Sequence, residues 1–214
     1  MSRGRFITLE GIEGAGKSTA ARFVVATLEA AGASVLATRE PGGTPLAERL
    51  RQILLERGAE RVSPVTETLL MFAARALHVE NVIRPALARG QWVVCDRFTD
   101  ATRAYQGRGR GVDGALIEAL AQAVHADLAP DCTLLLDLPA AEGLARARAR
   151  GGAASDRFEA ETVNFFEQVR AGYLALARRE PQRVRIIDAG APLAQVQGAI
   201  AAVLGELTAR PGGP

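Results

Sequence analysis

Residues 11–18 read Gly-Ile-Glu-Gly-Ala-Gly-Lys-Ser, a stretch that fits the pattern G-x-x-x-x-G-K-[ST] at every position. Loops of this pattern wrap backbone N–H groups around the phosphates of a nucleotide, and their lysine reaches the β- and γ-phosphates. The chain has 26 lysine and arginine residues, of which only Lys17 is a lysine. A slim ammonium stem suits this place better than a planar guanidinium does. The predicted nucleotide-contacting residues are Gly11, Ile12, Glu13, Gly14, Ala15, Gly16, Lys17, Ser18 and Thr19.

The sequence on either side of this loop supports the same interpretation. Residues 6–10, FITLE, read as a short apolar strand that runs into the loop. Residues 18–31 carry apolar side chains at helical spacing, and Gly32 follows where such a helix would end. A strand, a glycine loop and a helix in this order aim backbone N–H groups at an anion. The pattern therefore favours a nucleotide-binding loop over an ordinary glycine-rich turn.

The composition narrows the class of protein. A chain of 214 residues, 48% hydrophobic and 23% charged, can bury one full core. The net charge of +2 is too small to indicate a nucleic-acid or membrane partner. The sequence has no apolar run of transmembrane length and no signal peptide before its first strand, so we expect a cytoplasmic protein. Cys95 and Cys132 lie in apolar runs, which predicts two buried, reduced thiols.

Strand and helix patterns alternate along most of the chain, and this order predicts an α/β fold. We expect the three-layer P-loop NTPase fold, with a five-stranded parallel sheet and helices on both faces. The predicted strands are residues 6–10, 34–38, 92–96, 133–138 and 184–189, and the predicted helices are 18–31, 45–56, 64–77 extending towards 88, 113–125, 140–150, 159–179 and 193–209. We expect a single domain over residues 1–209, with a mobile flap near 142–158 and a disordered tail at 210–214.

Polar residues follow the predicted strands, at the sheet edge where ligands bind in open α/β folds. Asp96 ends the third strand and, with Ser18, is suited to hold Mg²⁺ directly or through water, although Asp96 also fits a helix N-cap. Arg97 points positive charge at a second phosphate, as phosphoryl transfer requires. Arg39 and Arg51 are further candidates, but a solvated helix position explains Arg51 equally well. The absence of any other lysine excludes the N-K-x-D guanine motif of GTPases.

Residues 145–157, ARARARGGAASDR, form a basic segment with paired glycines. Such a segment is suited to close over a nucleotide and to deliver an arginine to the charge in transit. A basic, solvated helix end explains the same pattern equally well.

Longer motifs resemble those of bacterial thymidylate kinases, which are P-loop nucleoside monophosphate kinases. The motifs are LEGIEGAGKST at 9–19, TREPGG at 38–43, FAAR at 72–75, DRF at 96–98, AYQG at 104–107 and DRFE at 156–159. The resemblance extends from residue 6 to about residue 204. It implies transfer of the ATP γ-phosphoryl group, with Mg²⁺, to dTMP to give dTDP for dTTP synthesis. It also implies a homodimer.

The resemblance assigns roles at the phosphate end of the site. It places Glu13 on the side of the acceptor sugar's 3′-hydroxyl. It gathers Arg97, Arg51 and either Arg39 or Glu40 around the acceptor phosphate and its metal-bound water. Lys17, Arg97, Glu13 and a flap arginine are the expected catalytic residues. Because Ile12, Glu13 and Ala15 of the loop are not basic, the catalytic cation is expected from the flap, where Arg150 matches best and Arg157 stays open.

At the base end, the resemblance implies that Arg75 hydrogen-bonds a thymine carbonyl. Thr102 and Gln106 would address the other base edge without a charge. The family's stacking aromatic falls at Met71, beside Phe72, and either could cover the base, whereas composition favours both as core residues.

Two other functions stay open. One is a kinase for another (deoxy)nucleoside monophosphate, since thymine is indicated by resemblance alone. The other is a non-transferring ATPase or switch, which Arg97 argues against because a switch needs no second phosphate pocket. His78 and His125 are expected to be ordinary helix residues.

Overall fold

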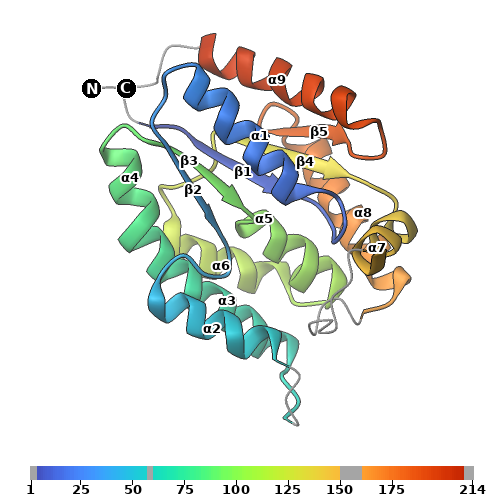
Figure 1. Cartoon of the computed structure of the whole chain (residues 1–214). Coiled ribbons are helices and arrows are strands. Elements are labelled where there is room, and N and C mark those ends of the chain that lie inside the picture. Colours follow the sequence, from blue (N-terminus) through green and yellow to red (C-terminus); the bar gives the residue numbers. More distant parts are fainter. Residues whose placement is uncertain (1–3, 57–59, 150–160, 210–214) are drawn as a thin grey trace.

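The computed structural model of the chain describes residues 4–56, 60–149 and 161–209. Five parallel strands form one sheet in the order β2-β3-β1-β4-β5 (Figure 1). The strands are β1 (Phe6–Glu10), β2 (Val35–Arg39), β3 (Trp92–Asp96), β4 (Cys132–Asp137) and β5 (Val184–Asp188). Each predicted strand matches an observed one within one residue at either end, and the expected α/β fold is confirmed.

Helices cover both faces of this sheet. The α-helices are α1 (Lys17–Ala30), α2 (Pro45–Leu55), α3 (Pro64–His78), α4 (Arg84–Ala88), α5 (Thr99–Thr102), α6 (Gly114–His125), α7 (Ala140–Ala149), α8 (Val163–Arg179) and α9 (Leu193–Ala209), and two π-helical segments are η1 (Val79–Ile83) and η2 (Arg103–Gly109). Helices α1 and α9 lie along one face, and α3, α4 and α6 lie on the other (Figure 1). Every residue of β1 is buried, which explains its continuous apolar run.

The position of β1 in the sheet determines where a ligand can bind. β1 is the central strand: β2 and β3 lie on one side of it, and β4 and β5 lie on the other. The crevice of an open α/β sheet opens at such a switch point, beyond the carboxyl ends of the strands. The loops that follow β1 and β3 therefore meet there, because Leu9 is in register with Asp96.

The sequence patterns missed one helical region. Residues 99–109 form α5 and η2, whereas no helix was predicted there. Gly107 and Gly109 weaken the intrinsic helix propensity of this stretch. Packing against α8 decides the structure instead, since a Cβ on Gly109 would lie only 2.7 Å from the Phe165 ring. The helix predicted over 64–88 is confirmed in length, but its middle is the π-helical η1.

Several other expectations meet the structure directly. Cys95 and Cys132 are both buried and free, as predicted. Within the described ranges, no helix combines the length and the apolar character needed to cross a membrane. The predicted flap lies largely outside the described residues, as does the tail at 210–214.

Candidate active site

Three glycines shape the loop after β1. Gly11, Gly14 and Gly16 have φ angles of 138°, 76° and 88°, in the region that side-chain-bearing residues avoid. Gly14 must also lack a side chain because a Cβ there would collide with the backbone of Gly143. Gly16 takes the left-handed conformation immediately before α1 and offers no capping side chain. The first N–H groups of α1 are therefore available to an anion.

Lys17 is buried beneath this loop. Its Nζ donates hydrogen bonds to the carbonyl oxygens of Gly11, at 3.2 Å, and Ile12, at 2.9 Å. Burial, with the nearby charge of Arg97, lowers the pKa of Lys17, while the carboxylates of Glu13 and Asp96 act in the opposite direction. A phosphate bound in the loop would place a negative charge beside the Lys17 ammonium and stabilise its charged form.

Arg97 stands at the end of β3 in an unusual backbone conformation. Its φ is +72°, a value that non-glycine residues rarely adopt. Residues in such conformations are often found at functional sites. The Arg97 N–H donates to the Leu9 carbonyl at 2.9 Å. The next N–H, of Phe98, donates to Glu10 Oε1 at 2.7 Å. Groups from β1 thus hold this turn on both sides.

Glu10 is a fully buried carboxyl group beneath the turn. Its second oxygen accepts a hydrogen bond from the Tyr173 hydroxyl at 2.7 Å. Burial, assisted by the charge of Asp100, raises the pKa of Glu10 to about 7, and Arg97 acts against this shift. The carboxyl group is therefore close to half-protonated near neutral pH.

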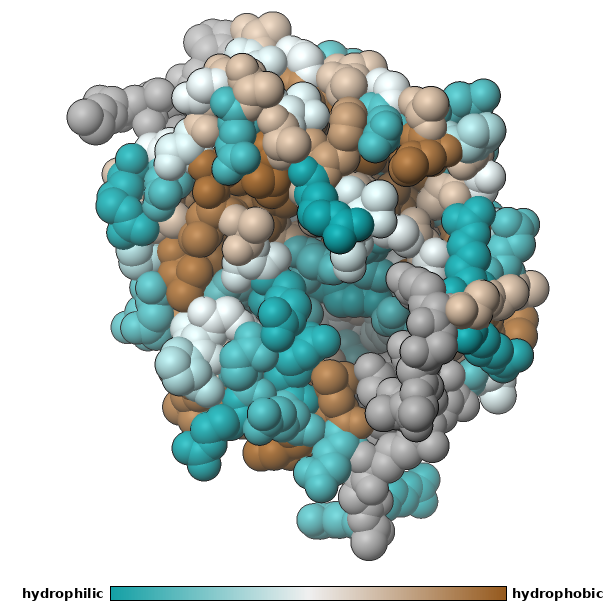
Figure 2. Space-filling model, viewed as in Figure 1, coloured by the Kyte–Doolittle hydropathy of each residue, from teal (hydrophilic) through white to brown (hydrophobic). Residues whose placement is uncertain are grey.

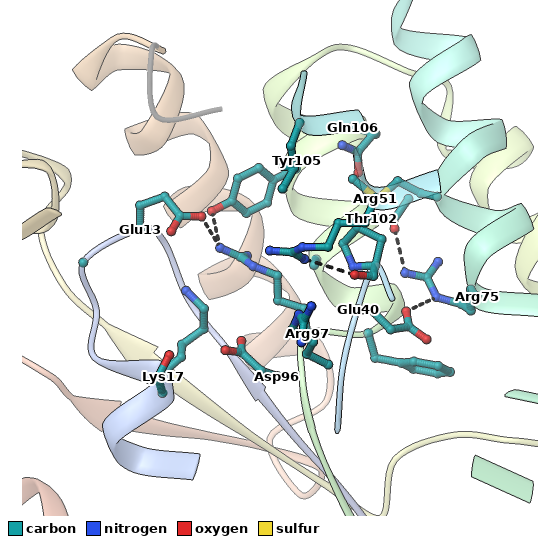
Figure 3. A pocket seen from close by; sticks show the side chains of 18 of the residues that line it. Glu13, Lys17, Glu40, Arg51, Arg75, Asp96, Arg97, Thr102, Tyr105 and Gln106 are labelled. Carbon is teal, nitrogen blue, oxygen red and sulfur yellow. Dashed lines mark hydrogen bonds and ion pairs between the residues drawn. The ribbon is translucent and has the colours of Figure 1, made fainter. Parts of the chain in front are cut away.

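The Arg97 guanidinium is the centre of a cluster at the phosphate end of the cavity. Its Nη2 donates to Glu13 Oε1 at 2.5 Å and to the Tyr105 hydroxyl at 3.0 Å (Figure 3). Its Nη1 donates to the Tyr173 hydroxyl at 3.3 Å. The guanidinium carbon also lies 4.7 Å from the Tyr105 ring centroid. Beside it, Asp96 Oδ1 is buried and has no hydrogen-bond partner among the described residues.

Arg75 is the corresponding cation at the other end. Its Nε donates to Glu40 Oε2 at 2.7 Å, and its Nη2 donates to Thr102 Oγ1 at 3.1 Å (Figure 3). The guanidinium carbon lies 4.7 Å from the Phe72 ring centroid and 5.2 Å from that of Phe98. Its Nη1 is buried without a hydrogen-bond partner in the described part of the chain. Such an orphaned donor in a cavity wall indicates a ligand acceptor.

One cavity of about 320 Å³ joins these two ends. Figure 2 shows this face of the molecule hollowed near its centre, with hydrophilic side chains around the opening. The structure brings most predicted site residues together in its wall, namely Glu13, Gly14, Gly16, Lys17, Ser18, Arg39, Glu40, Arg51, Arg75, Asp96, Arg97, Thr102 and Gln106. Arg150 and Arg157, the candidate flap cations, lie outside the described residues.

The two candidates for covering a base are placed differently. Met71 lines the cavity, whereas Phe72 does not. Phe72 is buried in a cluster with Val112, Ile117 and Ala121, behind Arg75. Helix α3 turns the two neighbours to different sides, so Met71 is the residue in position to meet a ligand.

The second strand and the segments after it contribute Arg39, Glu40 and Arg51. Arg39 is half-exposed and pairs with Glu48 at 2.8 Å. Arg51 on α2 donates to the Pro41 carbonyl at 3.0 Å and lines the cavity, so it is not simply a solvated surface residue. Glu40 pairs with Arg75 at 2.7 Å, whereas Arg97 pairs with Glu13, so Glu40 belongs to the Arg75 end of the cavity.

Sequence reasoning missed four residues that organise the site. Tyr105 lay within a quoted motif, and only its neighbour Gln106 was given a role. Glu67 accepts a hydrogen bond from Gln106 at 2.7 Å, and Tyr173 reaches Arg97 and Glu10 from α8. His78 is fully buried and bonded to Glu40, so the expectation of an ordinary helix residue was wrong. No local sequence pattern at these positions predicts contacts with residues so distant in the sequence.

His125 also differs from that expectation. It is buried, its Nε2 lies 2.7 Å from Thr99 Oγ1, and its Nδ1 lies 3.0 Å from the Leu128 carbonyl oxygen. Burial lowers its pKa. The residue therefore belongs to the polar packing beneath α5.

A second hollow lies on the other side of the phosphate loop. It is lined by Ala15, Gly16, Thr19, Ala20, Phe23, Leu136, Arg146, Ala189, Ala191, Leu193, Val196, Gln197 and Ile200. Arg146 reaches the Ala189 carbonyl at 2.8 Å. The wall is largely apolar and adjoins Thr19 at the start of α1, so a flat nucleobase would fit beside phosphates held by the loop.

The fold and the two cationic ends of the cavity define a P-loop phosphotransferase with a second anion site opposite its phosphate loop. Comparison with known proteins specifies the kind. The thymidylate kinase family model matches residues 9–200, and the chain belongs to this family.

Curated relatives match at full length. A thymidylate kinase of Alkalilimnicola ehrlichii is 55% identical over 210 residues, which are 98% of this chain and 96% of the relative. One of Pseudomonas syringae pv. syringae is 58% identical over 204 residues, which are 95% and 96% of the two chains. The crystal structure of thymidylate kinase from Ehrlichia chaffeensis is 32% identical, with a TM-score of 0.75, and the match covers 94% of this chain and 99% of that one.

Proposed function

We propose that the cavity transfers the γ-phosphoryl group of ATP to dTMP, giving dTDP for dTTP synthesis. The observation that carries this proposal is the pair of opposed anion sites at the sheet edge. Backbone N–H groups and Lys17 form one, and the Arg97 guanidinium forms the other, just beyond the ends of the neighbouring strands β1 and β3. Two phosphate groups held face to face in this way suit in-line transfer.

The donor nucleotide occupies the loop in this proposal. The N–H groups of residues 14–19 surround its phosphates, and Lys17 leaves the carbonyls of Gly11 and Ile12 to reach the β- and γ-oxygens. The adenine base lies in the largely apolar hollow beside Phe23 and Arg146.

Mg²⁺ fits the residues between the two sites. Ser18 lines the cavity, and Asp96 presents a buried oxygen that has no partner among the described residues. Hard cations prefer oxygen ligands. No group of three or more His, Cys, Asp or Glu residues able to hold a metal exists within the described ranges. The nucleotide phosphates and water would therefore complete the coordination. When bound, the ion neutralises charge on the transferring phosphates.

The acceptor occupies the remainder of the cavity. Arg97 and Arg51 bind its phosphate. As the phosphate binds, the hydrogen bond between Arg97 Nη2 and Glu13 breaks. Arg75 Nη1 donates to a carbonyl of the thymine, while Thr102 and Gln106 face its other edge.

Transfer then requires no covalent enzyme intermediate. An ionised oxygen of the acceptor phosphate attacks the γ-phosphorus, and the bond to the β,γ-bridging oxygen breaks. Catalysis consists of positioning and charge neutralisation, to which a flap arginine, Arg150 or Arg157, contributes.

An acceptor panel tests the proposal. ADP release from ATP is measured with no acceptor and with dTMP, dUMP, dCMP, dAMP and dGMP. We expect release to depend on acceptor and to be fastest with dTMP. Release that is the same with and without every acceptor would replace the kinase by an ATPase, and a faster rate with another monophosphate would change the assigned substrate.

The protein is also proposed to act as a homodimer in the cytoplasm. Helices α2 and α3 expose Leu46, Ile53, Val65 and Leu69, each between 45% and 53% exposed. An apolar surface of this kind favours contact with a second copy. Light scattering on the purified chain would reveal a mass of two chains, and a mass of one chain would refute the dimer.

A further inference from the structure

We infer that His78 is a positioning residue for base recognition, which it controls through Glu40 and Arg75. This inference rests on the proposed function and adds to it the group that fixes the direction of Arg75. His78 lies on α3, one turn beyond Arg75, and its side chain is fully buried. It lines no part of the cavity and so acts through its neighbours.

Both ring nitrogens of His78 have a partner. Nδ1 lies 3.0 Å from Glu40 Oε1, and Nε2 lies 2.7 Å from Thr38 Oγ1. Burial alone would raise the pKa of the Glu40 carboxyl, but Arg75 and His78 outweigh that effect and hold this pKa below its usual value. The ionised carboxylate only accepts hydrogen bonds. Nδ1 therefore carries a hydrogen and donates a hydrogen bond to Glu40.

Two hydrogen bonds and the backbone of Gly43 hold the imidazole ring in place. Gly43, with a φ of +87°, packs against it so closely that an added Cβ would meet Cδ2 of the ring. The ring therefore holds one oxygen of Glu40 in a single direction. The other oxygen of Glu40 receives Nε of Arg75 at 2.7 Å.

Arg75 is thereby held on three sides. Glu40 binds its Nε, Thr102 accepts from its Nη2, and the Phe72 ring lies against its face. Only Nη1 is left without a partner in the described part of the chain. A guanidinium only donates, so Nη1 donates to a carbonyl oxygen of a base and disfavours an amino group at the same place. Discrimination of thymine from cytosine then depends on the direction of Nη1, which His78 sets through Glu40.

Two amide variants separate this role from a structural one. The amide nitrogen of Asn occupies nearly the place of Nδ1, and that of Gln nearly the place of Nε2. His78→Asn keeps a donor towards Glu40, whereas His78→Gln directs its donor towards Thr38. Both place a neutral amide in the same site, so their effects on folding are comparable. His125→Gln on α6 is the matched control, because His125 is also buried with both nitrogens engaged.

The readout is the ratio of kcat/KM for dTMP to that for dCMP, together with the KM for ATP and the melting temperature. We expect H78Q to lower the ratio about tenfold, mainly through the KM for dTMP, and H78N to lower it less than threefold. The KM for ATP stays within about twofold in both. H125Q should lower the melting temperature and leave the ratio unchanged.

Equal ratios in H78N and H78Q would overturn the role of His78 while leaving the kinase activity of the parent chain in place. Failure of the parent chain to phosphorylate dTMP would overturn both proposals. A double-mutant cycle with Glu40→Gln gives a second test, since effects transmitted through one carboxylate are not additive. Combining E40Q with H78Q should lower the ratio no further than E40Q alone, and additive losses would refute the relay.

Discussion

The two ends of the cavity hold an arginine in different ways. At the phosphate end, Arg97 pairs with Glu13, a side chain that is itself 27% exposed to the cavity, and with two tyrosine hydroxyls. At the base end, Arg75 pairs with Glu40, which is 3% exposed and fixed by His78. We therefore expect the counter-ion of Arg97 to yield to an incoming phosphate more readily than that of Arg75 does. An arginine with an exchangeable partner suits phosphoryl transfer, and an arginine with a fixed partner suits selection of a base.

The largest effect should come from the cations that face the transferring group. Lys17→Ala and Arg97→Ala should each lower kcat by about a thousandfold or more, because positioned charges provide most of this catalysis. A coupled ADP assay with saturating ATP and dTMP gives the rates. Circular dichroism should remain that of the parent chain, and Arg84→Gln, a surface arginine paired with Asp127, should retain full activity. Near-normal turnover in either variant would remove that residue from the mechanism.

The next effect concerns the carboxyl group beneath the phosphate end. The pKa of Glu10 is about 7 in the folded chain, against 4.5 ordinarily, so the folded chain binds this proton more tightly than the unfolded chain does. Stability therefore falls as the pH rises from about 4.5 to about 7, by about 3 kcal/mol for this group. Urea unfolding of the parent chain and of Glu10→Gln at pH 5 and pH 8 measures this term.

The free energy of unfolding of Glu10→Gln should decline less across that pH interval, since its amide does not titrate. An identical decline in both proteins would show that Glu10 is ionised throughout.

The smallest effects compare one hydroxyl at each end. Thr102→Val removes the acceptor of Arg75 Nη2 in the immobile cluster and should raise the KM for dTMP about fivefold. Tyr105→Phe removes one of several partners of Arg97 and should change kcat less than about twofold. Steady-state kinetics on the two variants test the difference. A larger loss from Tyr105→Phe than from Thr102→Val would reverse the assignment of the two ends.

The phosphate end could be predicted from the sequence because it is built from neighbouring residues. Backbone amides, glycines at fixed offsets and a helix start are all local, so the stretch at residues 11–18 was enough. The strands were predicted within one residue because each is a short, largely apolar run between polar or glycine-containing segments. The polar residues at strand ends then followed from topology.

The base end could not be derived in the same way. Glu40, Arg75 and Thr102 come from three segments, and the His78–Glu40 contact joins residues 38 positions apart. Individual roles there came through family resemblance, which favoured neither Met71 nor Phe72. The helix at 99–109 was missed for a related reason, because packing against α8, rather than local propensity, forms it.

Lys17 has one further consequence, for chemistry performed on the protein. As the sole lysine it is the sole ε-amine of the chain, and its lowered pKa keeps more of it in the nucleophilic, neutral form. Reductive methylation with ¹³C-formaldehyde would place its label there and on the terminal amine alone. The resulting dimethylamine resonance would report on occupation of the loop without any engineered tag.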